Sequence, residues 1–293
     1  MNSSLIRVLQ QTPGFRSLAL RVHPIWFFRF TRWSVTLSNW FWPGTRGRAR
    51  IFEAVLRDQF NSKDLRARTH RYLVHLRLFK DIEIAWNNWE GRRGDWILIE
   101  GESHLQRAIE QGKGAVLISS HNYGFSKLVA PVLAQRGYKV HRGGNGGAKA
   151  DLRRSRWGEK EQVNWNYLHY KGDYWHRVQQ LKAIQRALAA NGVVHVSPRG
   201  FNKGDEDTAT EFFGRKYYLD PNWFRVFQIC QAPILPCFAV GNADRQIKIV
   251  IHPPLTLGKT TARAFAEIQS DYITRFPEYG RLWKSVYVDR GKW

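Results

Sequence analysis

The sequence predicts an α/β fold, with a mixed, mostly parallel sheet flanked by helices and a helical N-terminal region. From about residue 95 onward, short apolar runs of strand length alternate with amphipathic stretches of helix length. Before that point, residues 48–90 carry Arg, Leu, Phe and Trp at helical spacing with little Gly or Pro. At 293 residues and 43% hydrophobic content, the chain can form a real core. We expect a helical region over residues 1–90 and an α/β domain over residues 91–293.

The first expected helix covers about residues 22–42 and is amphipathic. Arg29 and Arg32 fall near its middle, which makes crossing a bilayer costly. A helix that lies in the headgroup plane fits better, and we expect one that associates with a membrane interface. The alternative is a helix packed on the protein's own core. The apolar face recurs at spacings of four and three and consists of Trp26, Phe30, Trp33, Leu37 and Trp40.

The remaining elements follow from periodicity and from Gly, Pro and Asn at the ends of segments. Pro43-Gly44 is expected to end the first helix, and two helices over 48–90 are divided near Asn61-Ser62. Residues 201–210 are expected to form a loop. Strands are expected over 95–100, 115–118, 138–141, 193–196, 232–240 and 246–252. Further helices are expected over 101–112, 151–166, 175–190, 221–230 and 261–276, and one more follows His121 and ends at about residue 134. On the helix over 175–190, the expected apolar face consists of Val178, Leu181, Ile184 and Leu188.

The charge balance predicts an anionic partner. Lys and Arg total 46 against 24 Asp and Glu, a formal net charge of +22. The chain also holds 13 Trp and 17 Phe, and cationic plus aromatic residues suit a membrane interface or single-stranded nucleic acid. No Cys/His group has zinc spacing and no Walker-type phosphate loop occurs, so we expect no metal and no bound cofactor. Cys230 and Cys237 are interpreted as core thiols of a reducing compartment.

The stretch Gly114–Lys127 contains the main candidate for chemistry. An apolar strand, Ala115 to Ile118, is followed by Ser119-Ser120 and then by His121. Ligands bind at the carboxyl ends of strands in open α/β sheets, so His121 lies where a reactive group is expected. A helix N-terminus disfavours imidazolium and keeps the ring available as a base. The alternative is that His121 only caps or packs at this turn.

Five blocks in a fixed order complete the pattern. They are the strand before His121, Val140-His141-Arg142, residues 188–200, residues 211–215 followed by 231–238, and Phe276-Pro277-Glu278 before Trp283-Lys284. Over residues 95–290, this order resembles the lysophospholipid acyltransferase superfamily, and within it the lipid A biosynthesis (late, Kdo-dependent) acyltransferases and their bacterial homologues. The resemblance implies a fold like that of glycerol-phosphate acyltransferases.

The resemblance also implies roles for single residues. In the family motif H-x4-D or H-x4-E, the histidine is the general base and the acid orients it. His121 matches the histidine, whereas Ser126 stands in place of the acid. An acid supplied from elsewhere is the alternative, with Asp205, Glu206, Asp207 and Glu211 as candidates, although a solvated loop explains these four equally well. Substrate contact is implied for Arg142, Arg199, Gly200, Phe213, Gly214 and Arg215, with Arg199 on a phosphate or polar headgroup.

The resemblance therefore implies an acyltransferase of lipid biosynthesis. We expect transfer of a fatty acyl group from an acyl carrier protein or coenzyme A thioester, the co-substrate, to a hydroxyl or amine of a lipid-like acceptor. We expect a peripheral protein of the cytoplasmic face of the bacterial inner membrane, bound to anionic lipids. A catalytically degenerate homologue that binds lipid or acyl carrier protein is the alternative. A basic nucleic-acid-binding protein has weaker support, because the basic residues are dispersed and form no recognised motif.

Overall fold

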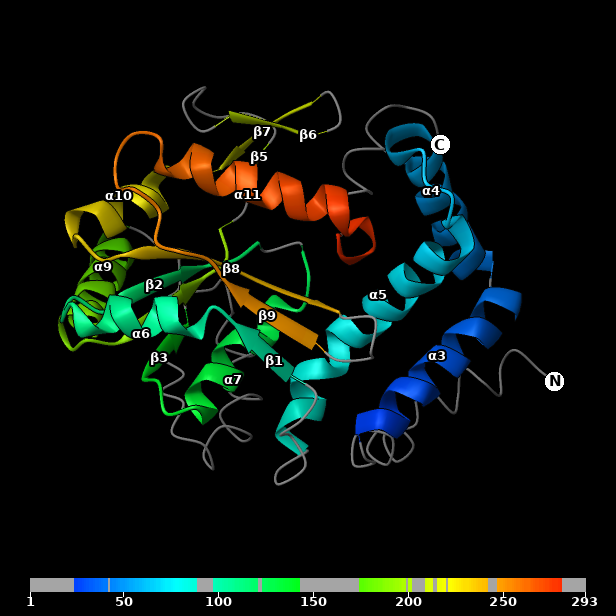
Figure 1. Cartoon of the computed structure of the whole chain (residues 1–293), viewed down its shortest axis with the longest axis horizontal. Coiled ribbons are helices and arrows are strands. Elements are labelled where there is room, and N and C mark those ends of the chain that lie inside the picture. Colours follow the sequence, from blue (N-terminus) through cyan, green and yellow to red (C-terminus); the bar gives the residue numbers. More distant parts are fainter. Residues whose placement is uncertain are drawn as a thin grey trace. The chain divides into compact units, whose positions relative to one another are not determined.

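The computed structural model divides the chain into two compact units (Figure 1). The first unit comprises Met1–Leu98, Val240–Ile247 and Ile273–Trp293, and the second comprises Ile99–Ala239 and Lys248–Tyr272. The predicted division at residue 90 stays a prediction. The structure describes residues 24–41, 43–88, 97–120, 123–142, 174–198, 200–201, 209–212, 215–219, 221–241 and 247–280.

Three helices form the main body of the first unit: α3 (Pro24–Phe41), α4 (Pro43–Phe60) and α5 (Leu65–Asn88). The predicted division near Asn61-Ser62 is confirmed, and Asn61 adopts a left-handed φ of 42° beyond the end of α4. The expectation that a helix starts only near residue 48 is wrong, because α4 begins at Pro43. Proline is favoured at the first helical position, since its missing N–H would be unpaired there.

The short helix η3 (Pro277–Tyr279) is tied to α5 within this unit by a buried carboxylate. Glu278 accepts a 2.8 Å hydrogen bond from Arg71 Nε and lies 3.5 Å from Arg68 Nη1. The adjacent Tyr279 packs edge-on against His75, with ring centroids 5.4 Å apart. A Cβ at Gly241 would collide with the Tyr279 hydroxyl, so this glycine permits the close approach.

A six-stranded sheet has the order β1-β9-β8-β2-β4-β3, which confirms the predicted α/β class. The pairs β2–β4, β2–β8 and β3–β4 are parallel. The strands are β1 (Ile97–Glu100), β2 (Ala115–Ile118), β3 (Val140–Arg142), β4 (Val193–Val196), β8 (Ile234–Gly241) and β9 (Ile247–Ile251).

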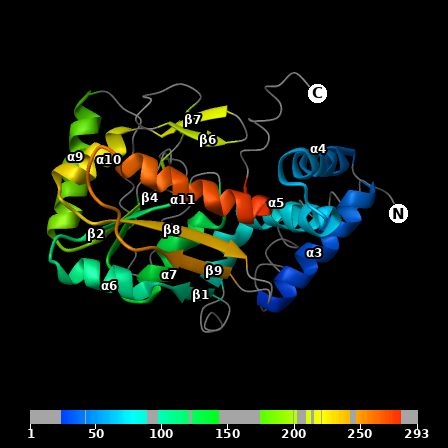
Figure 2. The ribbon, with the colours of Figure 1, turned by 45° about the horizontal axis from the view of Figure 1, so that its top comes forward.

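Helices cover the sheet, with α11 on one side and α6 and α7 on the other (Figure 1, Figure 2). On the α11 side, Phe238 of β8 stacks on Tyr272 at 4.3 Å and on Phe265 at 5.9 Å between centroids. Every residue of β2 and β4 is buried, as expected of strands covered on both faces. The helices are α6 (Glu102–Glu110), α7 (Val129–Gln135), α9 (Tyr174–Ala189), α10 (Pro221–Ile229) and α11 (Thr261–Arg275).

One predicted loop and two predicted helices can be compared with the described residues. The loop expected over residues 201–210 is wrong at its ends, because Phe201 and residues 209–210 belong to strands of a second, antiparallel sheet of order β5-β7-β6. The expected apolar face of α9 is confirmed at Ile184 and Leu188, whereas Leu181 is exposed. The helix expected over 151–166 lies outside the described residues. The small sheet consists of β5 (Gly200–Phe201), β6 (Ala209–Phe212) and β7 (Arg215–Leu219).

Candidate functional site

The carboxyl ends of β2 and β4 bring polar side chains together. The two strands pair in parallel up to Ile118 and Val196, and Ser119 N–H donates to the Val196 carbonyl at 2.9 Å. Ser119 and Ser197 therefore follow their strands at the same edge of the sheet. In open α/β sheets, ligands bind outside the carboxyl ends of the strands, and this edge is such a place.

A chain of three polar side chains lies at this edge. The Ser119 hydroxyl is 2.9 Å from His195 Nε2 and 2.7 Å from the Ser197 hydroxyl. His195 is fully buried, and burial together with the positive charge of Arg142 lowers its pKa to about 3. Its ring is therefore neutral near pH 7. No hydrogen-bond partner of its Nδ1 is found among the described residues.

Arg142 is the last residue of β3 and pairs in register with His195. Successive residues of a strand point to opposite faces, so in-register neighbours share a face. By the same register, Leu117 of β2 lies on this face beside His195. The structure thus puts a guanidinium on the strand adjacent to the serine and histidine chain.

The described residues on either side of positions 121–122 make hydrogen bonds to α11. Before these positions, the Ser120 hydroxyl accepts a 3.1 Å hydrogen bond from Gln269 Nε2 of α11. After them, the Tyr123 hydroxyl donates to the Tyr272 carbonyl at 2.7 Å. Gly124 has a φ of +61°, and a Cβ there would collide with the Ala239 carbonyl oxygen. The chain is therefore held by contacts directly before and directly after residues 121–122.

Ser126, the residue five positions beyond His121, is buried and begins the 3-10 helix η1 (Ser126–Leu128). The helix α7 follows directly, which confirms the predicted helix up to about residue 134. A serine here offers a hydroxyl and no negative charge. It can hold a ring nitrogen but cannot offset the charge of an imidazolium.

A profile of bacterial lipid A biosynthesis acyltransferases matches residues 67–279. The chain belongs to this family. It is accordingly an acyltransferase enzyme of lipid biosynthesis, with a lipid-like acceptor and an acyl donor. No curated protein matches the chain. The matched span includes the whole cluster at the ends of β2, β3 and β4, and the recognition made from the sequence is confirmed.

The remaining residues that the family resemblance implies are dispersed over the chain. Gly200 pairs with Leu219, and Arg215 pairs with Phe212, both within the small antiparallel sheet. Seven positions lie outside the described residues: they are His121, Arg199, residues 205–207, Phe213 and Gly214. The roles expected of them stay predictions, as do those of Ser126, Arg142, Gly200 and Arg215.

Three members of the polar cluster are not predicted as site residues from the sequence. The sequence predicts Ser119, His195 and Ser197 only as parts of a strand or a turn. A histidine within the run Val193–Val196 is a polar residue in an otherwise apolar buried strand, and this was the available clue. Ser119 is 76 residues from His195 and 78 residues from Ser197 in the sequence, so no local pattern could pair them.

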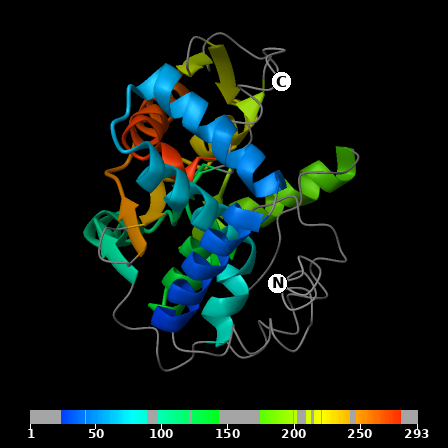
Figure 3. The same ribbon diagram turned by 90° about the vertical axis from the view of Figure 1, so that its right-hand side faces the viewer.

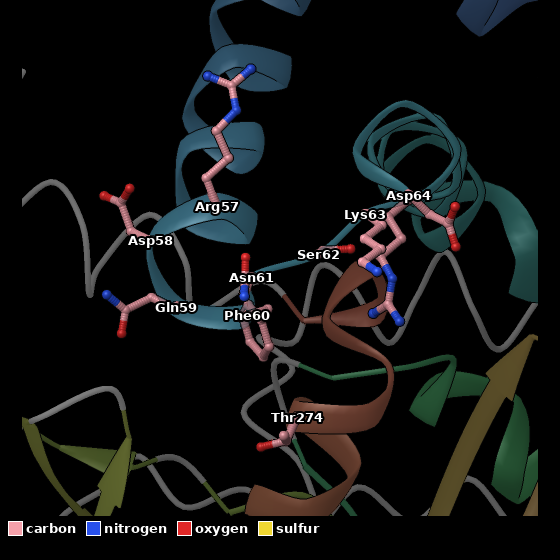
Figure 4. Close-up of a pocket in the computed structure, with 10 residues that line it drawn as sticks. Arg57, Asp58, Gln59, Phe60, Asn61, Ser62, Lys63, Asp64 and Thr274 are labelled. Carbon is pink, nitrogen blue, oxygen red and sulfur yellow. The ribbon is translucent and has the colours of Figure 1, made fainter.

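A pocket of about 560 Å³ lies in the first unit, where α4 ends and α5 begins (Figure 4). Its charges are mixed, since Arg57, Lys63 and Arg68 alternate with Asp58 and Asp64. None of the site residues predicted from the sequence lines it. Within the described ranges, no group of three or more His, Cys, Asp and Glu side chains is arranged to hold a metal ion.

Proposed function

We propose that this acyltransferase moves a fatty acyl group from an acyl carrier protein or coenzyme A thioester to a hydroxyl or amine of its lipid-like acceptor. The reaction takes place at the carboxyl edge of β2 and β4. The observation that carries the proposal is the polar cluster of Ser119, His195 and Ser197 at that edge. Ser119 lies two residues before His121 in the sequence, and the chain belongs to an acyltransferase family. Acyl thioester is the co-substrate, and no cofactor is needed.

His121 acts as the general base. It takes the proton from the acceptor hydroxyl as the oxygen attacks the thioester carbonyl carbon. The carbon–sulfur bond then breaks, and the imidazolium returns its proton to the leaving thiolate. Ser126 orients the ring without charge. Neutralising the orienting acid costs a serine protease about 10⁴ in turnover, so slow catalysis is expected here.

The absence of an acid at position 126 supports a second candidate function. A homologue that has lost transfer but still binds lipid or acyl carrier protein would retain the fold and the basic surface. The net charge of +22 suits the phosphates of coenzyme A, an acidic carrier protein and anionic lipid alike. In the active enzyme, Arg142 and Arg199 serve as contacts for anionic groups. Gly200, Phe213, Gly214 and Arg215 complete the proposed substrate contacts.

Membrane association is proposed to run through α3, which packs with α4 and α5 in the first unit (Figure 3). Its buried side consists of Thr31, Ser34 and Val35. Trp33, from the aromatic face, is 58% exposed, and Arg29 is exposed beside it. The helix therefore packs through small side chains and turns Trp33 outward, which favours an interfacial helix over one packed on the core through this face.

We further propose that the protein is peripheral to the cytoplasmic face of the inner membrane and is attracted to anionic lipid. Among the described residues, no helix combines the length and apolar character that crossing a bilayer requires. Anionic headgroups attract each exposed Lys or Arg near the surface by about 1 kcal/mol.

The experiment that tests the function is intact-mass analysis of lipid acceptors incubated with acyl-carrier-protein or acyl-coenzyme A thioesters. Wild type should add one acyl mass to the acceptor, and His121→Ala should abolish this product. His104→Ala is the matched control, because His104 lies on α6 and hydrogen-bonds with the exposed Arg107 one turn away. Unchanged transfer by His121→Ala would refute the assignment of the base. Binding of acylated partners without any transfer would favour the degenerate homologue.

A further inference from the structure

The hydrogen-bonded chain from His195 through Ser119 to Ser197 has a direction. It begins at a fully buried imidazole and ends at Ser197, which is only partly buried. Both contacts are short, 2.9 Å and 2.7 Å, as expected for real hydrogen bonds. The chain runs from the interior of the sheet toward the edge where acyl transfer is proposed.

The tautomer of His195 sets that direction. A neutral ring carries its proton on Nδ1 or on Nε2. A proton on Nδ1 would leave a buried N–H with no acceptor among the described residues. A proton on Nε2 instead leaves Nδ1 as an unpaired acceptor, which costs less, because unpaired buried donors are rarer in proteins than unpaired buried acceptors. The proton therefore sits on Nε2 and is donated to the Ser119 oxygen.

Ser119 must then donate its own proton onward. Two acceptors are within reach: the Ser197 oxygen at 2.7 Å and the Val196 carbonyl at 3.5 Å. The shorter contact is the stronger bond, so Ser119 donates to Ser197. The Ser197 hydroxyl thus accepts from inside the protein and keeps its proton for a group outside it. Each bond of such a chain polarises the next, which strengthens the last donor.

We propose that the Ser197 hydroxyl donates a hydrogen bond to the reacting acyl carbonyl oxygen, and that Ser119 and His195 are positioning residues that aim it. The inference rests on the proposed function. When the acceptor oxygen attacks, the carbonyl oxygen gains negative charge, and preorganised donors stabilise that charge. Ser197 keeps its proton throughout and forms no covalent bond. The carbonyl re-forms when the carbon–sulfur bond breaks.

The test is steady-state kinetics of the full chain with an acyl thioester and a lipid acceptor. Loss of one oxyanion donor lowers turnover by about 10²–10³, so Ser197→Ala should lower kcat by about 100-fold with little change in KM. Ser197→Thr, which keeps the hydroxyl, should retain most of the activity. His195→Leu should lower kcat less, and the double variant should be no worse than Ser197→Ala alone, because His195 acts through Ser197.

A matched control and a second readout separate this role from a structural one. His141→Leu changes another buried histidine, one strand away and on the opposite face, and should leave kcat unchanged. Nitrogen-15 NMR of the His195 ring should show a proton on Nε2 and none on Nδ1. If His195→Leu does not fold, Ser119→Ala breaks the same chain.

The outcomes are distinguishable. Full turnover by Ser197→Ala, or a proton on His195 Nδ1, would overturn this inference and leave the proposed function intact. Additive losses in the double variant would overturn the positioning role of His195. Absence of transfer by wild type would overturn the proposed function, and this inference with it.

Discussion

The Arg71–Glu278 pair offers a stability prediction whose size follows from burial. Glu278 is 5% exposed, whereas Arg71 and Arg68 are 43% and 27% exposed. Breaking a fully buried pair costs about 3–5 kcal/mol, and exposed pairs contribute about 0.2–1 kcal/mol. Because Arg71 is nearly half exposed and its bond is short, we expect a coupling of about 1–2 kcal/mol. Arg68, at 3.5 Å, should couple by less than about 1 kcal/mol.

The measurement is a double-mutant cycle of Arg71→Ala and Glu278→Gln, read by urea unfolding. Arg263–Glu267 is the matched control, an i,i+4 pair at 3.1 Å whose side chains are 67% and 63% exposed. Its coupling should be about 0.3–0.5 kcal/mol. Added salt should reduce the control coupling by a larger fraction, since screening acts on exposed charges. A coupling at Arg71–Glu278 no larger than the control would refute this reasoning.

Three further predictions concern the membrane, the base and pH. Trp33→Ala should weaken binding to anionic vesicles by about 1–3 kcal/mol in flotation assays, because burial of its ring is lost, while the similarly exposed Ile229→Ala should not. Ser126→Asp should raise the pKa of the His121 base and shift the acidic limb of the pH–rate profile upward; an unchanged profile would place residue 126 away from the ring. Because the folded pKa of His195, about 3, lies below its ordinary 6.5, the unfolded chain binds the proton first as pH falls. Stability from this group is therefore complete above about pH 6.5 and is lost toward pH 3, and His195→Leu should flatten that part of the urea-unfolding profile.

The sequence alone determined the fold class and the family. Buried strands such as Val193–Val196 are apolar throughout, and helices such as Thr261–Arg275 show a period of 3.6, so local spacing is enough to identify both. It also predicted the strand that ends before His121 and the helix that follows Ser126, because an apolar run and a longer apolar segment mark these two elements. These features depend on residues close together in the chain.

Pairings between distant segments were beyond the sequence. Arg71 of α5 and Glu278 are joined by a hydrogen bond although they lie far apart in the chain, and so are Ser119 and His195. The pairing of strands in the small sheet β5-β7-β6 likewise joins separate segments. The outward face of α3 is a similar case: the aromatic stripe is visible in sequence, but only packing through Thr31, Ser34 and Val35 decides that Trp33 faces solvent. Periodicity tells which residues share a face, whereas the partner of that face is set by the free energy of the whole packed arrangement.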